Sequence, residues 1–264
     1  MKKLENIDKM IGRKLKSGVF YFSLLLGWEV VCRVFELPHY LLPSPTMIAI
    51  ELVNTFPLLM SHAQVTMTQV MIGFLLAIGL GFILSMVMDR YQGLKNLIYP
   101  ILVVSQTIPI MAIAPLLMIW FGFGILPKVI VVVLVCFFPV TVSLTEGLSS
   151  TDHELIDLMK TMHATERQIF FKCKLPAALP SFFAGLRIAA TYSVMGAVVA
   201  EWVGAQKGLG IYMTRVMKSY RTPALFANIV VIVVITLLFV LMIDMISKKC
   251  MPWKNNQRRI EERG

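Results

Sequence analysis

One polar stretch decides how this chain folds: residues 146–176, EGLSSTDHELIDLMKTMHATERQIFFKCKLP, interrupt a series of long apolar segments. The stretch predicts two short amphipathic helices joined by a tight turn. Thr151 with Glu154 and Thr165 with Gln168 each fit the capping box, in which a hydroxyl and an acidic or amide side chain satisfy the free amides of a helix start. Such helices lie along a surface rather than crossing a bilayer.

The first of these helices carries an apolar stripe, whose members recur at i, i+3, i+4 and i+7: Leu155, Leu158, Met159 and Met162. Pro176 is expected to end the second helix, because proline lacks an amide hydrogen and disfavours helical geometry in the residue before it. His163 falls at the turn between the two helices. Histidine tolerates positive φ better than most residues, which favours a strained or open turn over a pH sensor.

The composition indicates a polytopic membrane protein rather than a water-soluble domain. The 264 residues are 57% hydrophobic, and the mean hydropathy is +0.75. The net charge of +10 does not point to nucleic acid, because the basic residues gather in tails and loops beside apolar segments, where they act as topology signals.

The length of the apolar segments predicts an all-α protein with about six transmembrane helices. The expected spans are residues 19–35, 65–88, 97–121, 128–144, 182–203 and 225–246. No small-residue cleavage site follows the first segment, so we expect an uncleaved membrane helix rather than a signal peptide. Glu29 and Arg33 lie four residues apart within it, and pairing on one helix face is favoured over a transport role.

Lysine and arginine set the expected orientation. Placing both termini on the inner side puts 18 of these residues there and 5 on the outer side. The 146–176 loop, between the fourth and fifth spans, is therefore expected to be cytoplasmic. Between the first two spans, residues 37–63 are expected to form a rigid outer loop containing Leu42-Pro43-Ser44-Pro45.

Two spans hold candidate residues of a translocation path. The third span is interrupted by prolines, which free backbone carbonyls, and two interpretations stand: a broken helix that lines a pathway, or a kink that serves packing alone. The fifth span is rich in small residues that permit close helix packing, and it ends at Glu201, which either gates the path or is a buried structural carboxylate. The candidates are Gln106, Pro109, Met111, Pro115 and Glu201.

The sequence contains no pattern for catalysis. It has no P-loop, HExxH, GxSxG or acidic metal cluster, and its four cysteines show no CxxC spacing that would suggest zinc. We therefore expect no enzymatic activity and no cofactor in this chain.

Several short motifs together resemble a known family. The 146–176 loop is similar to a pattern of Glu-Ala-Ala, three residues, Gly, nine residues, Ile, one residue and Leu-Pro, although Asp157-Leu158-Met159 replaces the triad, His163 the glycine and Cys173 the isoleucine. The remaining matches, in the same order as in the family, are Leu42-Pro43-Ser44-Pro45, Ile108-Pro109, Ala114-Pro115-Leu116, Trp120-Phe121-Gly122-Phe123-Gly124, Leu175-Pro176-Ala177-Ala178-Leu179-Pro180, Ala200-Glu201 and Gly208-Leu209-Gly210. The chain thus resembles the permease subunits of bacterial ATP-binding-cassette importers for nitrate, sulfonates, taurine and thiamine precursors. Glu201-Trp202-Val203-Gly204-Ala205 looks most like the thiamine-pyrimidine-precursor branch.

The resemblance implies a permease in the bacterial cytoplasmic membrane, with a second copy, most simply an identical one, two ATPase subunits that bind ATP-Mg, and an extracytoplasmic solute-binding protein. The spans and the charge distribution predict a cytoplasmic tail over 1–18, a permease domain over 19–247 and a basic cytoplasmic tail over 248–264. The two short helices would then form a coupling loop that docks on the ATPase, with the apolar stripe packing either into the ATPase or against the membrane helices. The implied coupling residues are Glu154, Asp157, Leu158, Met159, Met162, His163, Ala164, Arg167, Leu175 and Pro176.

The alternative function is a self-sufficient secondary transporter or channel. Such a protein would need intramembrane ionisable groups as coupling sites, and ideally an inverted repeat. Only Glu29, Arg33, Arg187 and Glu201 approach membrane depth, and no repeat is visible.

Overall fold

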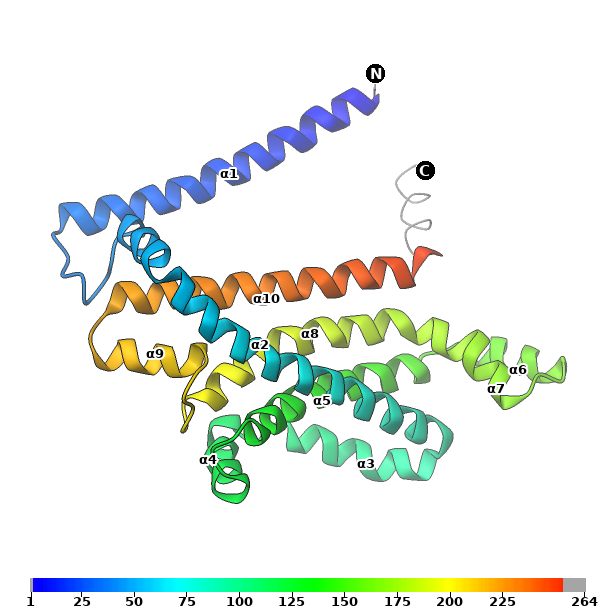
Figure 1. The fold of residues 1–264 in the computed structure, drawn as a ribbon. Coiled ribbons are helices and arrows are strands. Elements are labelled where there is room, and N and C mark those ends of the chain that lie inside the picture. Colours follow the sequence, from blue (N-terminus) through cyan, green and yellow to red (C-terminus); the bar gives the residue numbers. More distant parts are fainter. Residues whose placement is uncertain (1, 254–264) are drawn as a thin grey trace. The chain divides into compact units, whose positions relative to one another are not determined.

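The computed structural model describes residues 2–253, with side chains from residue 18 onward, and the regular elements in this range are all helices (Figure 1). This confirms the all-α prediction. Lys254, Arg258 and Arg259, part of the expected basic tail, lie outside the described residues. The elements are α1 (Lys2–Val34), α2 (Pro45–Arg90), α3 (Gln92–Ser105), α4 (Ile110–Phe121), α5 (Leu126–Ser149), α6 (His153–Thr161), α7 (Glu166–Ile169), the π-helical turn η1 (Phe170–Lys174), α8 (Leu175–Glu201), α9 (Leu209–Lys218) and α10 (Thr222–Cys250).

Four segments of the described chain are long and apolar enough to cross a membrane: α2, α5, the helical run Glu166–Glu201, and α10. A fifth span results if α3 and α4, which meet at a 98° bend, are one broken crossing. These segments correspond to five of the six predicted spans, although the predicted span 182–203 extends two residues beyond Glu201. The remaining predicted span, residues 19–35, is helical as far as Val34 in α1, but it is not among these candidates, so its crossing stays a prediction.

The chain divides into two compact units, Met1–Met60 with Met213–Val230, and Ser61–Tyr212 with Val231–Gly264. Within the first unit, Arg33 Nε donates to Glu29 Oε1 at 2.7 Å, which confirms the predicted pairing of these side chains. The same carboxylate accepts from the backbone amide of Thr46 at 3.0 Å and from its hydroxyl at 2.8 Å. Glu29 therefore joins α1 to the first turn of α2, which is a structural role.

The prediction of an outer loop over residues 37–63 is wrong for most of its length. Helix α2 already begins at Pro45 and continues through Pro57 to Arg90, so the connection from α1 is residues 35–44. Proline is tolerated in the first turn of a helix because its missing amide would have no intrahelical partner there. Within the motif, Leu42, Pro43 and Ser44 lie in the connection as predicted, and Pro45 starts the helix.

The core of the second unit is the contact between α5 and α8, which run side by side (Figure 1). Glycines along both helices allow this approach. A Cβ on Gly147 would lie 2.8 Å from Ser181 Cβ, one on Gly185 would lie 2.7 Å from the Pro139 carbonyl oxygen, and one on Gly196 would lie 2.8 Å from Val135 Cγ2. The small residues predicted to permit close packing in the fifth span do so.

The 146–176 loop contains the two short helices predicted from its sequence, with different ends. Asp152 caps α6 by accepting from the Glu154 amide at 2.9 Å, whereas the Thr151 hydroxyl donates to the Leu148 carbonyl. The predicted Thr151 capping box is therefore wrong, since the Thr151 hydroxyl is bound to the last turn of α5. The Thr165–Gln168 capping box of α7 is confirmed.

Pro176 does not end the second helix, contrary to prediction. The chain winds without interruption from α7 through η1 into α8, where Pro176 occupies the first turn. In η1 the Leu175 amide donates to the Phe170 carbonyl, an i to i−5 bond. Because the hydrogen-bond pattern changes in this wider turn, Pro176 lies in the first turn of a new α-helical segment. Its missing amide hydrogen is tolerated there.

Candidate coupling loop and translocation cavity

The 146–176 loop is held together by its own small core and exposes an apolar face. Ile156, Ile169 and Cys173 are buried against one another, with Met159 and Ala164 packed around them. The buried face of α6 therefore follows Ile156 and Met159, not the whole predicted stripe. Leu155, Leu158 and Met162 remain outside, with 56% of Leu158 and 73% of Met162 exposed. Of the two packing arrangements considered for the stripe, packing of these three against the membrane helices of this chain is excluded.

The remaining predicted coupling residues lie on the same loop. Exposed side chains belong to Glu154, Asp157, His163 and Arg167, whereas Leu175 and Pro176 are half-buried at the start of α8. Asp157 pairs with Lys160 within α6 at 3.2 Å. The loop thus brings together an apolar patch with charges beside it, which is a surface suited to a protein partner.

His163 occupies the turn between α6 and α7 with φ of +59°, as the sequence indicated. Because the left-handed region costs a non-glycine residue about 1–2 kcal/mol, we expect His163→Gly to raise the free energy of unfolding by up to about 1 kcal/mol. His163→Val should lower it, because a β-branched residue tolerates positive φ poorly. Thermal unfolding of both variants in detergent measures this difference. If the parent is more stable than the His163→Gly variant, the imidazole itself stabilises the turn.

A cavity of about 640 Å³ opens where the third predicted span breaks. Helix α3 ends at Ser105 and α4 starts at Ile110, and the segment between them contributes Gln106 and Ile108 to the lining. The other walls come from α5 and α8, with Phe138, Ser143 and Tyr192 among their contributions. Of the two interpretations of the prolines, the structure favours the broken helix that lines a cavity. The break falls at Pro109, while Pro100 and Pro115 are accommodated inside helices.

The cavity wall is apolar with a few hydrogen-bonding groups. Its polar side chains are Ser105, Gln106, Ser143 and Tyr192, and among the residues that the structure describes no charged side chain lines it. The nearest candidate on α8, Arg187, precedes the lining residue Ile188 and is bound through its Nε to Asp244 Oδ1 of α10 at 2.9 Å. The positive charge of Arg187 is therefore paired with a carboxylate on α10.

The other predicted path residues do not line this cavity. Met111 is exposed elsewhere on α4, Pro109 and Pro115 shape the backbone, and Glu201 is fully buried. Of the two roles considered for Glu201, the geometry favours the buried structural carboxylate.

Glu201 is the centre of a hydrogen-bond network inside the second unit. Its Oε1 accepts from the Thr66 hydroxyl at 2.8 Å, and its Oε2 accepts from the Gly210 amide at 2.7 Å. The Thr66 hydroxyl in turn accepts from the Leu209 amide at 2.9 Å. Lys128, buried and donating to the Phe123 and Gly124 carbonyls, provides an opposite charge nearby.

Two glycines enclose this carboxylate closely. Gly208 has φ of +136°, and a Cβ there would collide with the Glu201 carboxyl group. A Cβ on Gly210 would meet the Val198 carbonyl oxygen and would lie 2.9 Å from Glu201 Cβ. The Gly208-Leu209-Gly210 motif is therefore required by the approach of backbone to Glu201.

Sequence reasoning missed the residues that join the loop to the membrane helices. Asp89 of α2 bonds Lys174 of η1, and Tyr99 of α3 bonds Glu146 of α5 (2.7 Å). It also missed the cavity residues Ser143 and Tyr192. Partners 47 and 85 residues apart leave no local periodicity that could have revealed them.

A multi-pass α-helical protein with an exposed polar loop and a cavity at the break between α3 and α4 has the features expected of the membrane domain of a transporter. Residues 70–251 match the family described as binding-protein-dependent transport system inner membrane component. The chain belongs to this family and is a permease subunit of an ATP-binding-cassette importer.

Relatives cover nearly the whole chain. The formylaminopyrimidine transport permease protein ThiX of Halalkalibacterium halodurans is 39% identical over 92% of this chain and 97% of its own length. The riboflavin transport system permease protein RibX of Chloroflexus aurantiacus is 30% identical over 88% of this chain and 87% of its own length. The putative aliphatic sulfonates transport permease protein SsuC of Bacillus subtilis is 27% identical over 96% of this chain and 94% of its own length. Resemblance to the family inferred from the motifs is thus confirmed.

Proposed function

We propose that this permease carries a small, uncharged nitrogen heteroaromatic compound, of the class of pyrimidine precursors, inward across the bacterial cytoplasmic membrane. The observation that carries the solute class is the uncharged wall of the cavity, where Phe138 and Tyr192 offer aromatic surfaces and Gln106 offers an amide. An anionic sulfonate would require a cation there, and Arg187 is already paired. The likeness to a formylaminopyrimidine permease supports the same class.

The energy source in this proposal is a separate ATPase that binds ATP-Mg, and this chain holds no cofactor. The ATPase docks on the 146–176 loop, where Leu155, Leu158 and Met162 form an exposed apolar patch. Both termini and this loop lie on the cytoplasmic side, in keeping with the excess of lysine and arginine there. An extracytoplasmic binding protein delivers the solute, and a second copy of this chain completes the membrane core.

The proposal is tested by reconstituting this chain with the ATPase and the solute-binding protein of its own importer. We expect Leu158→Glu with Met162→Glu to weaken retention of the ATPase by about tenfold or more, because two charges replace apolar contacts at the centre of the patch. A control with the same added charge, His153→Glu with Thr161→Glu, changes exposed positions of α6 outside the patch and should retain the ATPase.

Uptake into the same vesicles tests the solute class. Formylaminopyrimidine should accumulate only with ATP, and excess taurine should not compete. Effective competition by taurine would contradict the proposed solute class. Uptake by this chain alone, without ATP or ATPase, would instead support the secondary-transporter alternative.

A further inference from the structure

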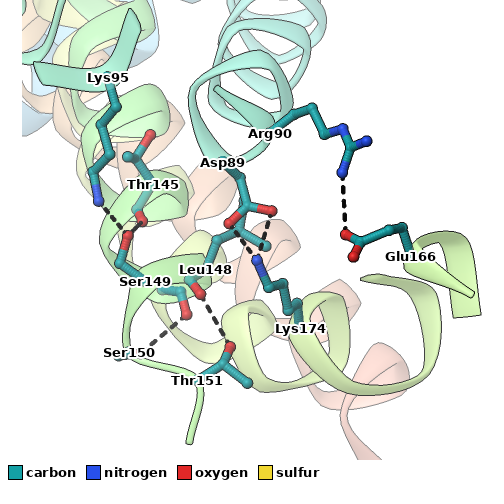
Figure 2. A network of polar contacts seen from close by, with 11 residues as sticks. Asp89, Arg90, Lys95, Thr145, Leu148, Ser149, Ser150, Thr151, Glu166 and Lys174 are labelled. Atoms are coloured by element: carbon teal, nitrogen blue, oxygen red, sulfur yellow. Dashed lines mark hydrogen bonds and ion pairs between the residues drawn. The ribbon is translucent and has the colours of Figure 1, made fainter. Parts of the chain in front are cut away.

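An ion pair joins the 146–176 loop to the end of α2. Lys174 Nζ lies 2.9 Å from Oδ1 and 3.1 Å from Oδ2 of Asp89, so both carboxylate oxygens accept from one ammonium group (Figure 2). The side chains are only 23% and 14% exposed. Because salt screens a half-buried pair less than an exposed one, this contact holds its geometry better than a surface ion pair.

Each of the two residues belongs to a helical segment that is tied to its neighbours. Lys174 ends η1, directly after Cys173, whose side chain belongs to the buried core shared by α6 and α7. Displacement of the exposed face of α6 therefore moves Lys174 with it. Asp89 is the penultimate residue of α2, and only Tyr91 separates α2 from α3.

Helix α3 carries this connection toward the cavity. Near its start it is joined to α5 by Lys95, whose Nζ donates to Ser149 Oγ at 2.5 Å (Figure 2), and by the Tyr99–Glu146 bond. At its other end it reaches Ser105 and Gln106, which line the cavity at the break. One helix thus connects the corner of α2 and α3 to the cavity wall.

We infer that Asp89 and Lys174 are positioning residues that transmit movement of the 146–176 loop to the corner of α2 and α3, and so to the cavity. This inference depends on the proposed docking of an ATPase on the loop. The adjacent pair of Arg90 with Glu166 does not serve this purpose, although it joins the same segments at 3.1 Å (Figure 2). Its side chains are 63% and 70% exposed, and such pairs contribute little once solvent and salt screen them.

The test measures how ATP changes access to the cavity. Gln106→Cys provides a thiol in the cavity wall for a membrane-impermeant maleimide, in a Cys250→Ser background because Cys250 is exposed, whereas Cys32, Cys136 and Cys173 are buried. In the reconstituted complex, we expect trapping with ATP and vanadate to change the labelling rate about fivefold or more. Retention of the ATPase and its hydrolysis of ATP are measured on the same samples.

Asp89→Lys or Lys174→Asp alone should keep the ATPase bound and hydrolysing ATP, while the nucleotide-dependent change in labelling falls below about twofold. The exchanged pair, Asp89→Lys with Lys174→Asp, should restore most of the change, which a loss of folding alone would not predict. Arg90→Gln is the matched control and should behave like the parent. If these single variants do not fold, Lys174→Met replaces them. Methionine keeps an unbranched apolar side chain like that of lysine but removes the charge.

Single variants that keep the full labelling change would overturn the inference, as would an exchanged pair that binds ATPase but stays uncoupled. A parent complex that binds no ATPase, or whose labelling does not respond to nucleotide, would contradict the proposed function instead.

Discussion

Replacing Glu201 with alanine is expected to lower the free energy of unfolding by about 3–5 kcal/mol, enough to deplete folded protein. The change removes the acceptor for the Gly210 amide and the Thr66 hydroxyl, and it leaves the buried Lys128 without its nearby opposite charge. Each donor left without an acceptor inside the protein costs about 1–3 kcal/mol. Thermal unfolding in detergent and the monodisperse fraction after size exclusion measure the loss.

Glu201→Gln is the control, because glutamine retains the shape and one acceptor oxygen. It should lose less stability than the alanine variant. If both variants unfold like the parent, the network is not what holds the start of α9 in place. If both lose transport with full stability, Glu201 acts in the path after all.

Gly185→Leu is expected to separate α5 from α8 and to prevent stable folding. A Cβ at this position would already lie 2.6 Å from Ser143 Cβ and 2.7 Å from the Pro139 carbonyl oxygen, and backbone cannot yield as a flexible side chain does. Overpacking of a well-packed core costs about 1–3 kcal/mol, and more where helix backbones must move apart. The apparent melting temperature in detergent is the measurement.

Gly79→Leu is the matched control for this substitution. It lies within α2, and a Cβ there would have no neighbour within 4 Å. The same added volume should therefore leave the melting temperature unchanged or raise it slightly, because glycine is a poor helix former. Equal losses at Gly79 and Gly185 would show that the effect is not one of packing between α5 and α8.

Local patterns predicted much of the loop and little of what anchors it. The Thr165–Gln168 capping box and the turn at His163 depend on residues a few positions apart, and both were predictable. The cap of α6 was assigned one residue too early, because Thr151 and Asp152 are both good capping residues and only the end of α5 decides between them.

Contacts between distant segments could not be predicted in the same way. The pairing of Asp89 with Lys174 and the burial of Glu201 beneath Gly208 arise from how helices pack, which sequence spacing does not encode. The break in the third span could be predicted as one of two alternatives, because a proline in the sequence indicates a local break or kink of the helix. The residues of α5 and α8 that complete the cavity wall could not be predicted, because they depend on how these helices pack.

The π-helical turn at Phe170–Lys174 also changes the angular phase of the chain. In an α-helix each residue advances by about 100°, so a turn that holds an extra residue offsets everything before it from everything after it by roughly that angle. A single helical wheel drawn through residues 166–201 would therefore assign the wrong faces to α7. The loop core at Ile169 and the α5-facing glycines of α8 belong to two separate wheels, and the offset between them sets the direction in which the loop leaves the membrane helix.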